Sequence, residues 1–423
     1  MREHRSAERR PRSGSERERI ARMVERKTRP AERSSATSVN RERIAHMKEV
    51  EKANLAAANG PIDTPFLILV LLLTGIGLIM VFSASFPSAY YENGNPAHYF
   101  IRQGIFAIMG VAAMVVVSRI NYQRFRGVAQ SLLYLAIILL VLVLIIGIKV
   151  NNARRWLGIG DLLTFQPSEI AKIAVVVYFA DSISKKKDKM QDFRSGIMPY
   201  VVVLGIIAVL MMLEPHFSGT MLILGVGAIL MIVGGIPAKW IAGVAAVGAA
   251  GIYLVLGVFG YGESRISMWL DPWQDALGDG YQMCQSLLAI GSGGLLGVGL
   301  GRSRQKFLYL PEEHNDFIFA IVCEELGLVG ATIIMVIFAA LILRGFWIAL
   351  HARDRFGTLL VVGVISLIAL QTFLNIAVVT GFVPATGISL PFFSYGGTAL
   401  SMQLAEMGIV LSVSRQMRAS KAE

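Results

Sequence analysis

The stretch YLPEEHNDFIFAIVCEE, residues 309–325, joins a cluster of ionisable side chains to the start of an apolar run. The cluster comprises Glu312, Glu313, His314 and Asp316. If the apolar run enters a membrane, partial desolvation at its edge raises the pKa of Asp316 and makes it a better base than a surface carboxylate. An aspartate at a helix N-terminus is also a common cap, and the helix dipole lowers its pKa. A cap needs one carboxylate and not a cluster, so the composition of the stretch favours the base.

Further charged groups lie inside apolar runs. Glu324 follows Asp316 by eight positions, roughly 12 Å along a helix and about 80° around it, whereas Glu325 points to the opposite side. Carboxylates at membrane depth are costly and usually face a cavity or a partner. In QPSEIAK, Glu169 and Lys172 are three positions apart and can neutralise each other on one helix face. We expect a structural ion pair there, with a place along a substrate groove as the alternative.

Basic residues also occur in segments that the topology places outside the membrane, where positive charge is disfavoured. They are Arg154 and Arg155 in NNARRWLGIG and Arg302, Arg304 and Lys306 in GRSRQKFLYLPEEHND. Guanidinium groups bind phosphate oxygens through paired hydrogen bonds, so the group favours a phosphate or pyrophosphate ligand. Snorkelling to lipid phosphates is the alternative for any single member.

The composition shows which class of protein must position these groups. Hydrophobic residues make up 54% of the chain and charged residues 16%, and the mean hydropathy is +0.59. These values exclude an ordinary soluble domain and predict a polytopic membrane protein. The net charge of +11 does not indicate nucleic acid, because most Lys and Arg lie in the termini and in loops on one side. Cys284 and Cys323 have neither disulfide nor metal-site spacing and are expected to be free thiols.

Apolar runs of membrane-spanning length recur about ten times after residue 63. They cover 64–83, 101–118, 129–148, 167–183, 198–213, 217–234, 238–258, 316–342, 357–381 and 396–414. A backbone in lipid must satisfy its own hydrogen bonds, so all of these runs are predicted helices. The expected fold is therefore an all-α polytopic membrane protein with about ten transmembrane helices. The positions of the basic loops place both termini in the cytoplasm and the connecting segments 84–100, 149–166, 259–315 and 382–395 outside the membrane.

The N-terminal segment differs sharply from the rest of the chain. Residues 1–63 are rich in Arg, Glu and Ser and are expected to form a basic, largely disordered cytoplasmic tail. The tail contains the near-repeats RERIARM at 17–23 and RERIAHM at 41–47. Short helices that contact anionic lipid or a cytosolic partner are the alternative for these repeats.

The membrane domain is expected to cover residues 64–415 and to be followed by a cytoplasmic tail at 416–423. A large extracellular loop, 259–315, separates helices seven and eight, and loops of that length usually have a function or local structure. Its apolar, glycine-rich piece at 284–301 is too short for a clear span. We expect a helix that lies on the outer leaflet or dips into it.

Three strings of the chain, in this order, strongly resemble the SEDS family (shape, elongation, division and sporulation) of bacterial cell-wall proteins. They are NNARRWLGIGDLLTFQPSEIAK, SRQKFLYLPEEHNDFIFAIVCEELG and VPATGISLPFFSYGGTALS, and the resemblance spans roughly residues 64–415. It implies a ten-helix fold, peptidoglycan glycosyltransferase activity on lipid II, and a complex with a class B penicillin-binding protein. The second string is closer to the division and sporulation branch than to the elongation branch. In EPHFSGT, many relatives carry an acidic residue in place of His216, which leaves a carboxylate role at this position open.

The resemblance also implies roles for individual residues. Asp316 matches the aspartate that is regarded as catalytic in the family, and it would take the proton from the 4-hydroxyl of the acceptor sugar. Arg154, Arg155 and Lys306 would neutralise the departing pyrophosphate, and a divalent cation (Mg or Mn) near Asp316 is left open. In-line attack would invert the α-linked donor to a β-1,4 bond. The further candidate substrate-binding residues are Glu312, His314, Glu324 and Ser394, the last with a purely structural re-entrant turn as its alternative.

Two other functions stay open. A lipid II transporter would use the buried Glu169, Lys172 and Glu324 in the membrane core, whereas polymerisation depends on the outer lip. A non-catalytic scaffold of the division machinery would act through the basic tail, which could bind other division proteins. The polymerase interpretation places the chain in the bacterial cytoplasmic membrane, with an active site that faces outside and with lipid II and the growing glycan strand as ligands.

Overall fold

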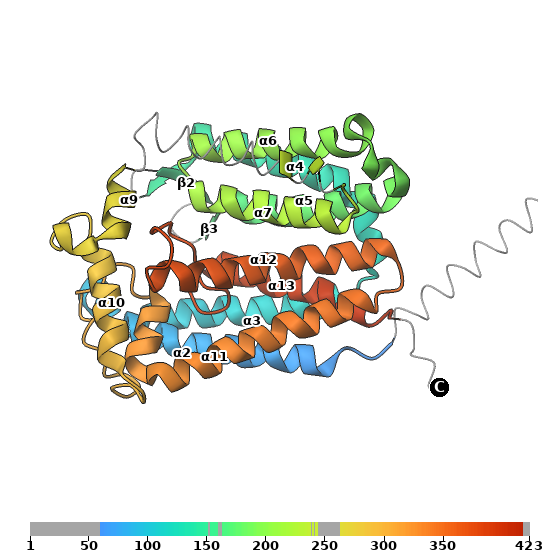
Figure 1. The fold of residues 1–423 in the computed structure, drawn as a ribbon. Helices are drawn as coiled ribbons and strands as arrows, with labels where there is room; N and C mark the ends of the chain where they lie inside the picture. Colours follow the sequence, from blue (N-terminus) through green and yellow to red (C-terminus); the bar gives the residue numbers. More distant parts are fainter. Residues whose placement is uncertain are drawn as a thin grey trace, which may run out of the picture. The chain divides into compact units, whose positions relative to one another are not determined.

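The apolar runs form a bundle of long helices that lie side by side (Figure 1). The computed structural model describes residues 60–150, 153–159, 163–237, 239–240, 242–243 and 263–417. Its long helices are α2 (Thr64–Asn93), α3 (His98–Arg119), α4 (Phe125–Ile146), α5 (Pro167–Lys186), α6 (Met198–Leu213), α7 (Phe217–Val233), α11 (Ile318–Leu350), α12 (Arg355–Val379) and α13 (Gly397–Ser414). Within the described part of the chain, six helices are long and apolar enough to cross a membrane. The mostly helical membrane fold predicted from the sequence is therefore confirmed.

Some predicted segments lie outside the described residues. They are most of the span 238–258, the tail repeats at 17–23 and 41–47, and the last six residues, 418–423. Elsewhere the predicted spans lie close to the observed helices, and α6 begins and ends at the predicted residues.

Local capping chemistry sets several helix ends. Asp63 precedes α2, and its carboxylate accepts a hydrogen bond from the amide of Phe66 at 3.0 Å. The helix then continues ten residues beyond the predicted end at 83, and it ends where Gly94 takes a left-handed φ of 66°. Part of the segment predicted as an outer loop, 84–100, is therefore helical.

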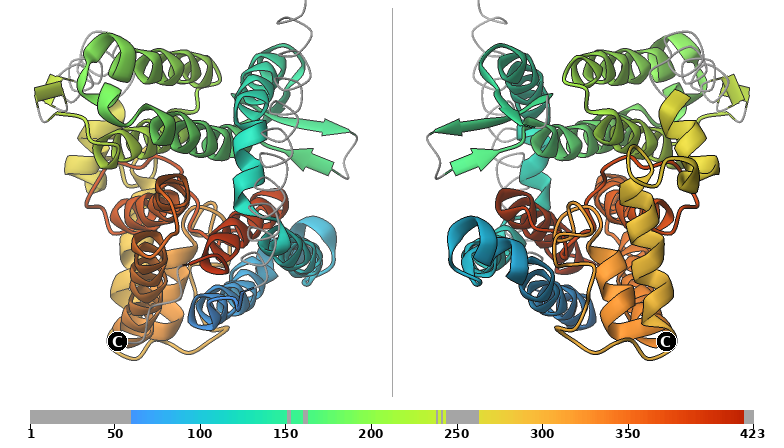
Figure 2. Two further views of the ribbon diagram at one scale, coloured as in Figure 1. Left: turned by 90° about the vertical axis from the view of Figure 1, so that its right-hand side faces the viewer. Right: turned by 90° about the vertical axis from the view of Figure 1, so that its left-hand side faces the viewer.

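The helices differ in how much of their apolar surface is buried inside the bundle. α12 is the most enclosed of the candidate spans, with 72% of its apolar window buried, and it packs against α5, α7 and α11. By contrast α3 packs mainly on α13 and exposes aliphatic side chains such as Ile108, which is 73% exposed. Seen end-on, α4, α5, α6 and α7 lie to one side of α12, and α2, α3 and α11 lie to the other (Figure 2). Such exposed apolar surface is typical of helices that face lipid.

A small antiparallel sheet follows α4 in a segment predicted as an outer loop, 149–166. It has the order β1 (Ile148–Val150), β2 (Ala153–Ile159) and β3 (Leu163–Phe165). Side chains alternate between the two faces of a strand. In β2 this alternation turns Arg154 and Arg155 in different directions, so the sheet decides which of the two faces the bundle.

The segment before α11 forms an outer cap on the bundle. It begins with α9 (Glu263–Leu270) and continues to α10 (Tyr281–Gly293), which runs across the ends of the long helices (Figure 1). The glycine-rich residues that follow α10 pair with α11 where Gly327, at φ 67°, interrupts the helix. The amide of Val298 donates to the carbonyl of Glu324 at 3.0 Å, and that of Leu328 donates to Gly294 at 2.9 Å. The glycine-rich piece is thus no span.

Candidate active site

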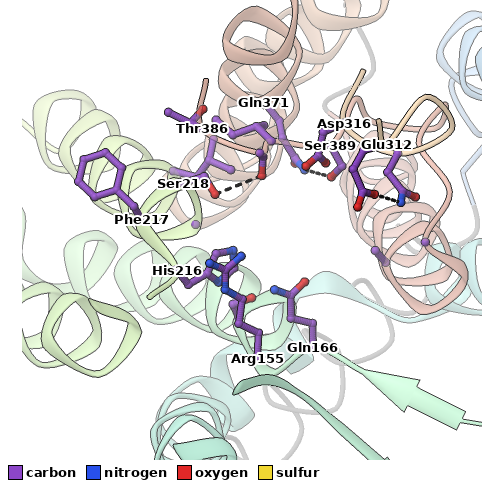
Figure 3. A pocket seen from close by; sticks show the side chains of 18 of the residues that line it. Arg155, Gln166, His216, Phe217, Ser218, Glu312, Asp316, Gln371, Thr386 and Ser389 are labelled. Atoms are coloured by element: carbon purple, nitrogen blue, oxygen red, sulfur yellow. Dashed lines mark hydrogen bonds between the residues drawn. The ribbon is translucent and has the colours of Figure 1, made fainter. Parts of the chain in front are cut away.

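A cavity of about 790 Å³ opens at the end of the bundle where α3, α5, α7, α11 and α13 begin. Its polar lining comes from several elements that are far apart in the sequence. These side chains are Arg102, Arg155, Gln166, Glu169, Lys172, His216, Ser218, Glu312, Asn315, Asp316, Gln371, Thr386 and Ser389. Figure 3 shows Asp316 and Glu312 on one side of the cavity, and Arg155, Gln166 and His216 across from them. The cavity therefore has an acidic wall that faces a basic one.

Asp316 lies two residues before α11 and lines the acidic wall. The helix has no side-chain cap bond, so capping does not account for this residue. Gly387 approaches the Asp316 carboxylate closely, because a Cβ on this glycine would lie 3.1 Å from its Oδ2. The pKa of Asp316 is raised to about 6, mainly by burial and also by the Glu312 carboxylate, while the positive charge of Arg155 opposes the rise. A carboxylate with this pKa is largely ionised at neutral pH and is suited to accept a proton.

Glu312 shapes the turn that presents Asp316. It has a left-handed φ of 57°, which is uncommon for a residue with a side chain. Its carboxylate accepts a hydrogen bond from Asn315 Nδ2 at 2.5 Å, and its carbonyl accepts from the amides of Asn315 and Phe317 at 3.0 and 3.3 Å. These bonds hold the turn, so that Glu312 and Asp316 both face the cavity.

Arg155 is the main cation of the opposite wall. Its Nε donates to the carbonyl of Glu214 at 3.3 Å, and its Nη2 donates to the carbonyl of Pro215. Both bonds anchor the guanidinium between the β2 strand and the connection from α6 to α7. Arg102, from the first turns of α3, lines the same cavity. Arg102 was not among the residues predicted from the sequence, although a positive charge at the outer end of a span was a usable signal.

Glu169 and Lys172 form the expected ion pair, with Lys172 Nζ 2.8 Å from Glu169 Oε2. The side chains are 12% and 6% exposed, respectively. Both also line the cavity, so the pair lies along the groove that was its alternative placement. The ion pair and the position in the cavity lining are compatible, because the two side chains can contact each other on one face of α5 and still border the cavity.

His216, at the start of α7, is the residue where the sequence departs from the family pattern. It lines the cavity, and its Nδ1 is buried without a hydrogen-bond partner. Burial is the main reason why the pKa of His216 falls to about 3, and the nearby charges of Arg155 and Lys172 contribute to this decrease. The imidazole is therefore neutral at physiological pH.

Lys306 and Glu324 do not line the cavity. Lys306 was expected to contact pyrophosphate, but its Nζ is 2.9 Å from Glu325 Oε1, and the two side chains are 3% and 0% exposed. Glu324 accepts hydrogen bonds from Ser303 Oγ and from the amide of Arg304, the latter at 2.8 Å. Both carboxylates therefore hold the loop before the active-site turn onto α11. The break at Gly327 brings this loop against the helix, which spacing alone does not reveal.

Two other predicted contacts, Arg154 and His314, do not line the cavity. Arg154 is exposed and donates to the carbonyls of α4 residues Leu144 and Ile145 at 3.4 Å. His314 stacks on Tyr99, with ring centroids 4.7 Å apart. Its Nδ1 is 3.3 Å from the Glu313 carboxylate.

Ser394 makes hydrogen bonds within the protein, which agrees with the structural turn that was the alternative prediction for its segment. Its hydroxyl donates to the carbonyl of Asn315 at 2.8 Å and accepts from the amide of Leu390 at 2.7 Å. The bond to Asn315 ties the connection between α12 and α13 to the turn that carries Asp316.

Cys284 and Cys323 are both free and buried, as expected. Over the described ranges, no group of three or more His, Cys, Asp or Glu side chains could hold a metal ion. A divalent cation near Asp316 therefore stays a prediction.

The chain has relatives among known proteins. The family model for the FtsW, RodA and SpoVE group, described as a cell cycle protein, matches residues 63–419. Stage V sporulation protein E of Bacillus subtilis is 41% identical over 358 residues, which are 84% of this chain and 98% of that protein. A probable peptidoglycan glycosyltransferase FtsW of Geobacter metallireducens is 40% identical over 376 residues, covering 88% of this chain and 97% of that protein.

Solved structures show the same architecture. A chain of a peptidoglycan synthase complex, studied for its coordination of polymerization and crosslinking, aligns with a TM-score of 0.70 and 25% identity over 84% of this chain and 98% of that one. The rod shape determining protein RodA of Thermus thermophilus aligns with a TM-score of 0.62 and 25% identity, over 85% of this chain and 99% of that one.

Proposed function

Because this chain belongs to the FtsW, RodA and SpoVE family of cell cycle proteins, we propose that it is a peptidoglycan glycosyltransferase that polymerises lipid II, with Asp316 as general base. Several of its relatives are named as probable peptidoglycan glycosyltransferases. The observation that carries the proposal is the cavity itself, where a carboxylate with a raised pKa faces a basic wall. Polymerisation of a lipid-linked sugar diphosphate needs both groups.

The reaction follows from the two walls. Asp316 removes the proton from the 4-hydroxyl of the acceptor sugar as that oxygen attacks the anomeric carbon of the donor. The bond from the anomeric carbon to the diphosphate oxygen breaks, and the electron pair leaves with undecaprenyl diphosphate. Arg155 and Arg102 stabilise the negative charge that develops on the leaving group. In-line attack converts the α-linked donor to a β-1,4 bond, and no covalent enzyme intermediate is needed.

The helices around the cavity add proximity. A multi-pass bundle holds the polyprenyl tails of donor and acceptor in one plane of the membrane, which lowers the entropic cost of their encounter. The active site faces the outside of the cytoplasmic membrane, because the positive-inside rule puts the opposite loops in the cytoplasm. A class B penicillin-binding protein is the proposed partner, since one structural relative comes from a synthase complex for polymerization and crosslinking. Division or sporulation is the proposed setting.

A transporter function finds less support in the structure. A transporter was expected to use Glu169, Lys172 and Glu324 in the membrane core. The Glu324 carboxylate already accepts hydrogen bonds from the Ser303 hydroxyl and from the backbone amides of the two residues that follow Ser303. Asp316, in contrast, has its carboxylate open to the cavity.

The deciding experiment is lipid II polymerisation by the full-length protein with its partner penicillin-binding protein in detergent. Asp316→Asn keeps the size of the side chain and removes the base, so we expect a loss of glycan strands of about 100-fold or more. Asp192→Asn, at an exposed aspartate between α5 and α6, is the matched control and should polymerise normally. Normal strand synthesis by both Asp316→Asn and Asp316→Ala would overturn the assignment.

A further inference from the structure

The three residues that end at Asp316 have their backbone carbonyls held one after another. The bonds run from Tyr395 N to His314 O at 2.9 Å, from Ser394 Oγ to Asn315 O at 2.8 Å, and from Asn375 Nδ2 to Asp316 O at 2.7 Å. All three donors lie on α12 or on the connection that follows it. The position of the Asp316 backbone is therefore set by elements some 60 to 80 residues further along the chain.

Asn375 makes the bond that is nearest to the chemistry. Its side chain is fully buried in α12. The same Nδ2 also donates to the carbonyl of Ile388 at 2.6 Å. An amide nitrogen carries two hydrogens, so both of its donors are used. One side chain thus joins Asp316 to a second segment, residues 385–389, which we call the strap.

The strap lines the cavity. The hydroxyl of Ser218, on α7, donates to the carbonyl of Gly387 at 3.2 Å, and Gln371 on α12 donates to the hydroxyl of Ser389 at 3.3 Å (Figure 3). Gly387, at φ 67°, faces the Asp316 carboxylate closely, since a Cβ there would lie 3.1 Å from Oδ2. The strap therefore fills the space beside the proposed base, and its distance from Asp316 depends on Asn375.

We propose that Asn375 is a positioning residue for the reaction: its single amide fixes the spacing between Asp316 and the strap, and so sets where the carboxylate meets the acceptor hydroxyl. This inference rests on the proposed function of Asp316. Asn375 does not line the cavity and acts through the two carbonyls that it holds. A base displaced by about 1 Å loses on the order of 100-fold in rate, whereas binding of the lipid tails does not depend on that distance.

A matched control exists on the other side of the same connection. Gln103, on α3, is also fully buried, and its amide also bonds two backbone groups, the carbonyl of Ser394 at 3.1 Å and the amide of Gly396 at 3.2 Å. It does not bond to the residues 314–316. Replacing Asn375 or Gln103 by leucine therefore removes a similar buried amide, but only the first change frees Asp316.

The test compares Asn375→Leu with Gln103→Leu in lipid II polymerisation, with rates normalised to folded protein. We expect Asn375→Leu to lower kcat by about 10- to 100-fold and to leave KM for lipid II nearly unchanged, while Gln103→Leu keeps kcat close to wild type. Asn375→Ala removes both donors without adding volume and is assayed in parallel. Wild-type kcat in either folded Asn375 variant would overturn the proposal, and so would equal kcat losses in the Asn375 and Gln103 variants.

A second measurement does not depend on turnover. A carbodiimide modifies protonated carboxyl groups, so the pH dependence of Asp316 labelling, read by mass spectrometry of its peptide, reports the state of this side chain. We expect the labelling midpoint to fall in Asn375→Leu, because a loosened carboxylate gains water, and to stay in place in Gln103→Leu. An unchanged midpoint in Asn375→Leu would contradict the inference even if wild type makes no glycan. Failure of the wild type to polymerise lipid II would instead refute the proposed function.

Discussion

The buried ion pair between Lys306 and Glu325 can be used to test whether Lys306 has a structural role or binds the substrate. The sequence predicts that Lys306 contacts the departing pyrophosphate, whereas the structure places its ammonium 2.9 Å from Glu325 Oε1, with both side chains almost fully buried. Lys306→Met removes the charge and keeps most of the apolar stem. The variant therefore leaves a carboxylate buried without its cation.

The expected cost can be worked from the contacts that remain. Removing one partner of a buried ion pair typically destabilises a protein by about 3–5 kcal/mol. Glu325 keeps hydrogen bonds from Ser83 Oγ at 2.8 and 2.6 Å and from the amide of Ser303 at 3.2 Å, so we expect the lower end, about 3 kcal/mol. At an unfolding entropy of about 2 cal/mol/K per residue, that corresponds to a fall of roughly 4 °C in the unfolding midpoint of a domain of this size. The double variant Lys306→Met/Glu325→Gln removes both charges and should recover most of the loss.

The chain carries its own probe for this measurement. Cys284 and Cys323 are free and only 1% and 8% exposed, so a thiol-reactive dye reports thermal unfolding in detergent. Donor kinetics with lipid II are measured on the same samples at a temperature where all variants are folded. An unchanged midpoint together with weakened donor use in Lys306→Met would refute the structural role and return this lysine to the pyrophosphate.

Three further predictions concern the acceptor side and the tail. A base with a pKa of about 6 is largely ionised only above that pH, so kcat/KM should fall as the pH drops below about 6. Glu312→Gln should move the midpoint of this fall to lower pH, because the Glu312 carboxylate helps to raise the pKa of Asp316. Profiles of kcat/KM from about pH 5 to 8 for wild type and variant test this prediction, and coincident midpoints would contradict it. Gly387→Ala should lower kcat, because the added Cβ would lie 3.1 Å from the Asp316 carboxylate. The control Gly381→Ala has a similar left-handed φ of 74°, but its Cβ would meet only Met283 at 3.7 Å and Leu287 at 3.8 Å, so kcat should stay near that of wild type. Equal values of kcat in the two variants would contradict the proposed contact. Deletion of residues 1–55 should leave polymerisation in detergent nearly intact, and a large loss of turnover would show that the tail takes part.

The sequence alone determined the class of the protein, most of its helices and the position of the proposed base. Membrane-spanning helices can be predicted in this way because each one satisfies its own hydrogen bonds and must be long and apolar over a continuous run. Asp316 could be found for the same reason, since it stands where such a run begins. The extension of α2 to Asn93 and the three strands after α4 were missed, because polar segments at a membrane edge carry no comparable length signal.

The tertiary structure alone decided which charged groups face the cavity. Arg154 and Arg155 are neighbours of the same type, yet the β2 strand turns only Arg155 toward Asp316. The sequence also predicted that Lys306 binds the pyrophosphate. In the structure its loop packs against α11 near the break at Gly327, and Lys306 pairs with Glu325. Asn375 carries no sequence signal at all, since its role arises from contact with two carbonyls, one of them 59 positions away. The partners of buried polar groups depend on how distant segments meet, and local spacing does not contain that information.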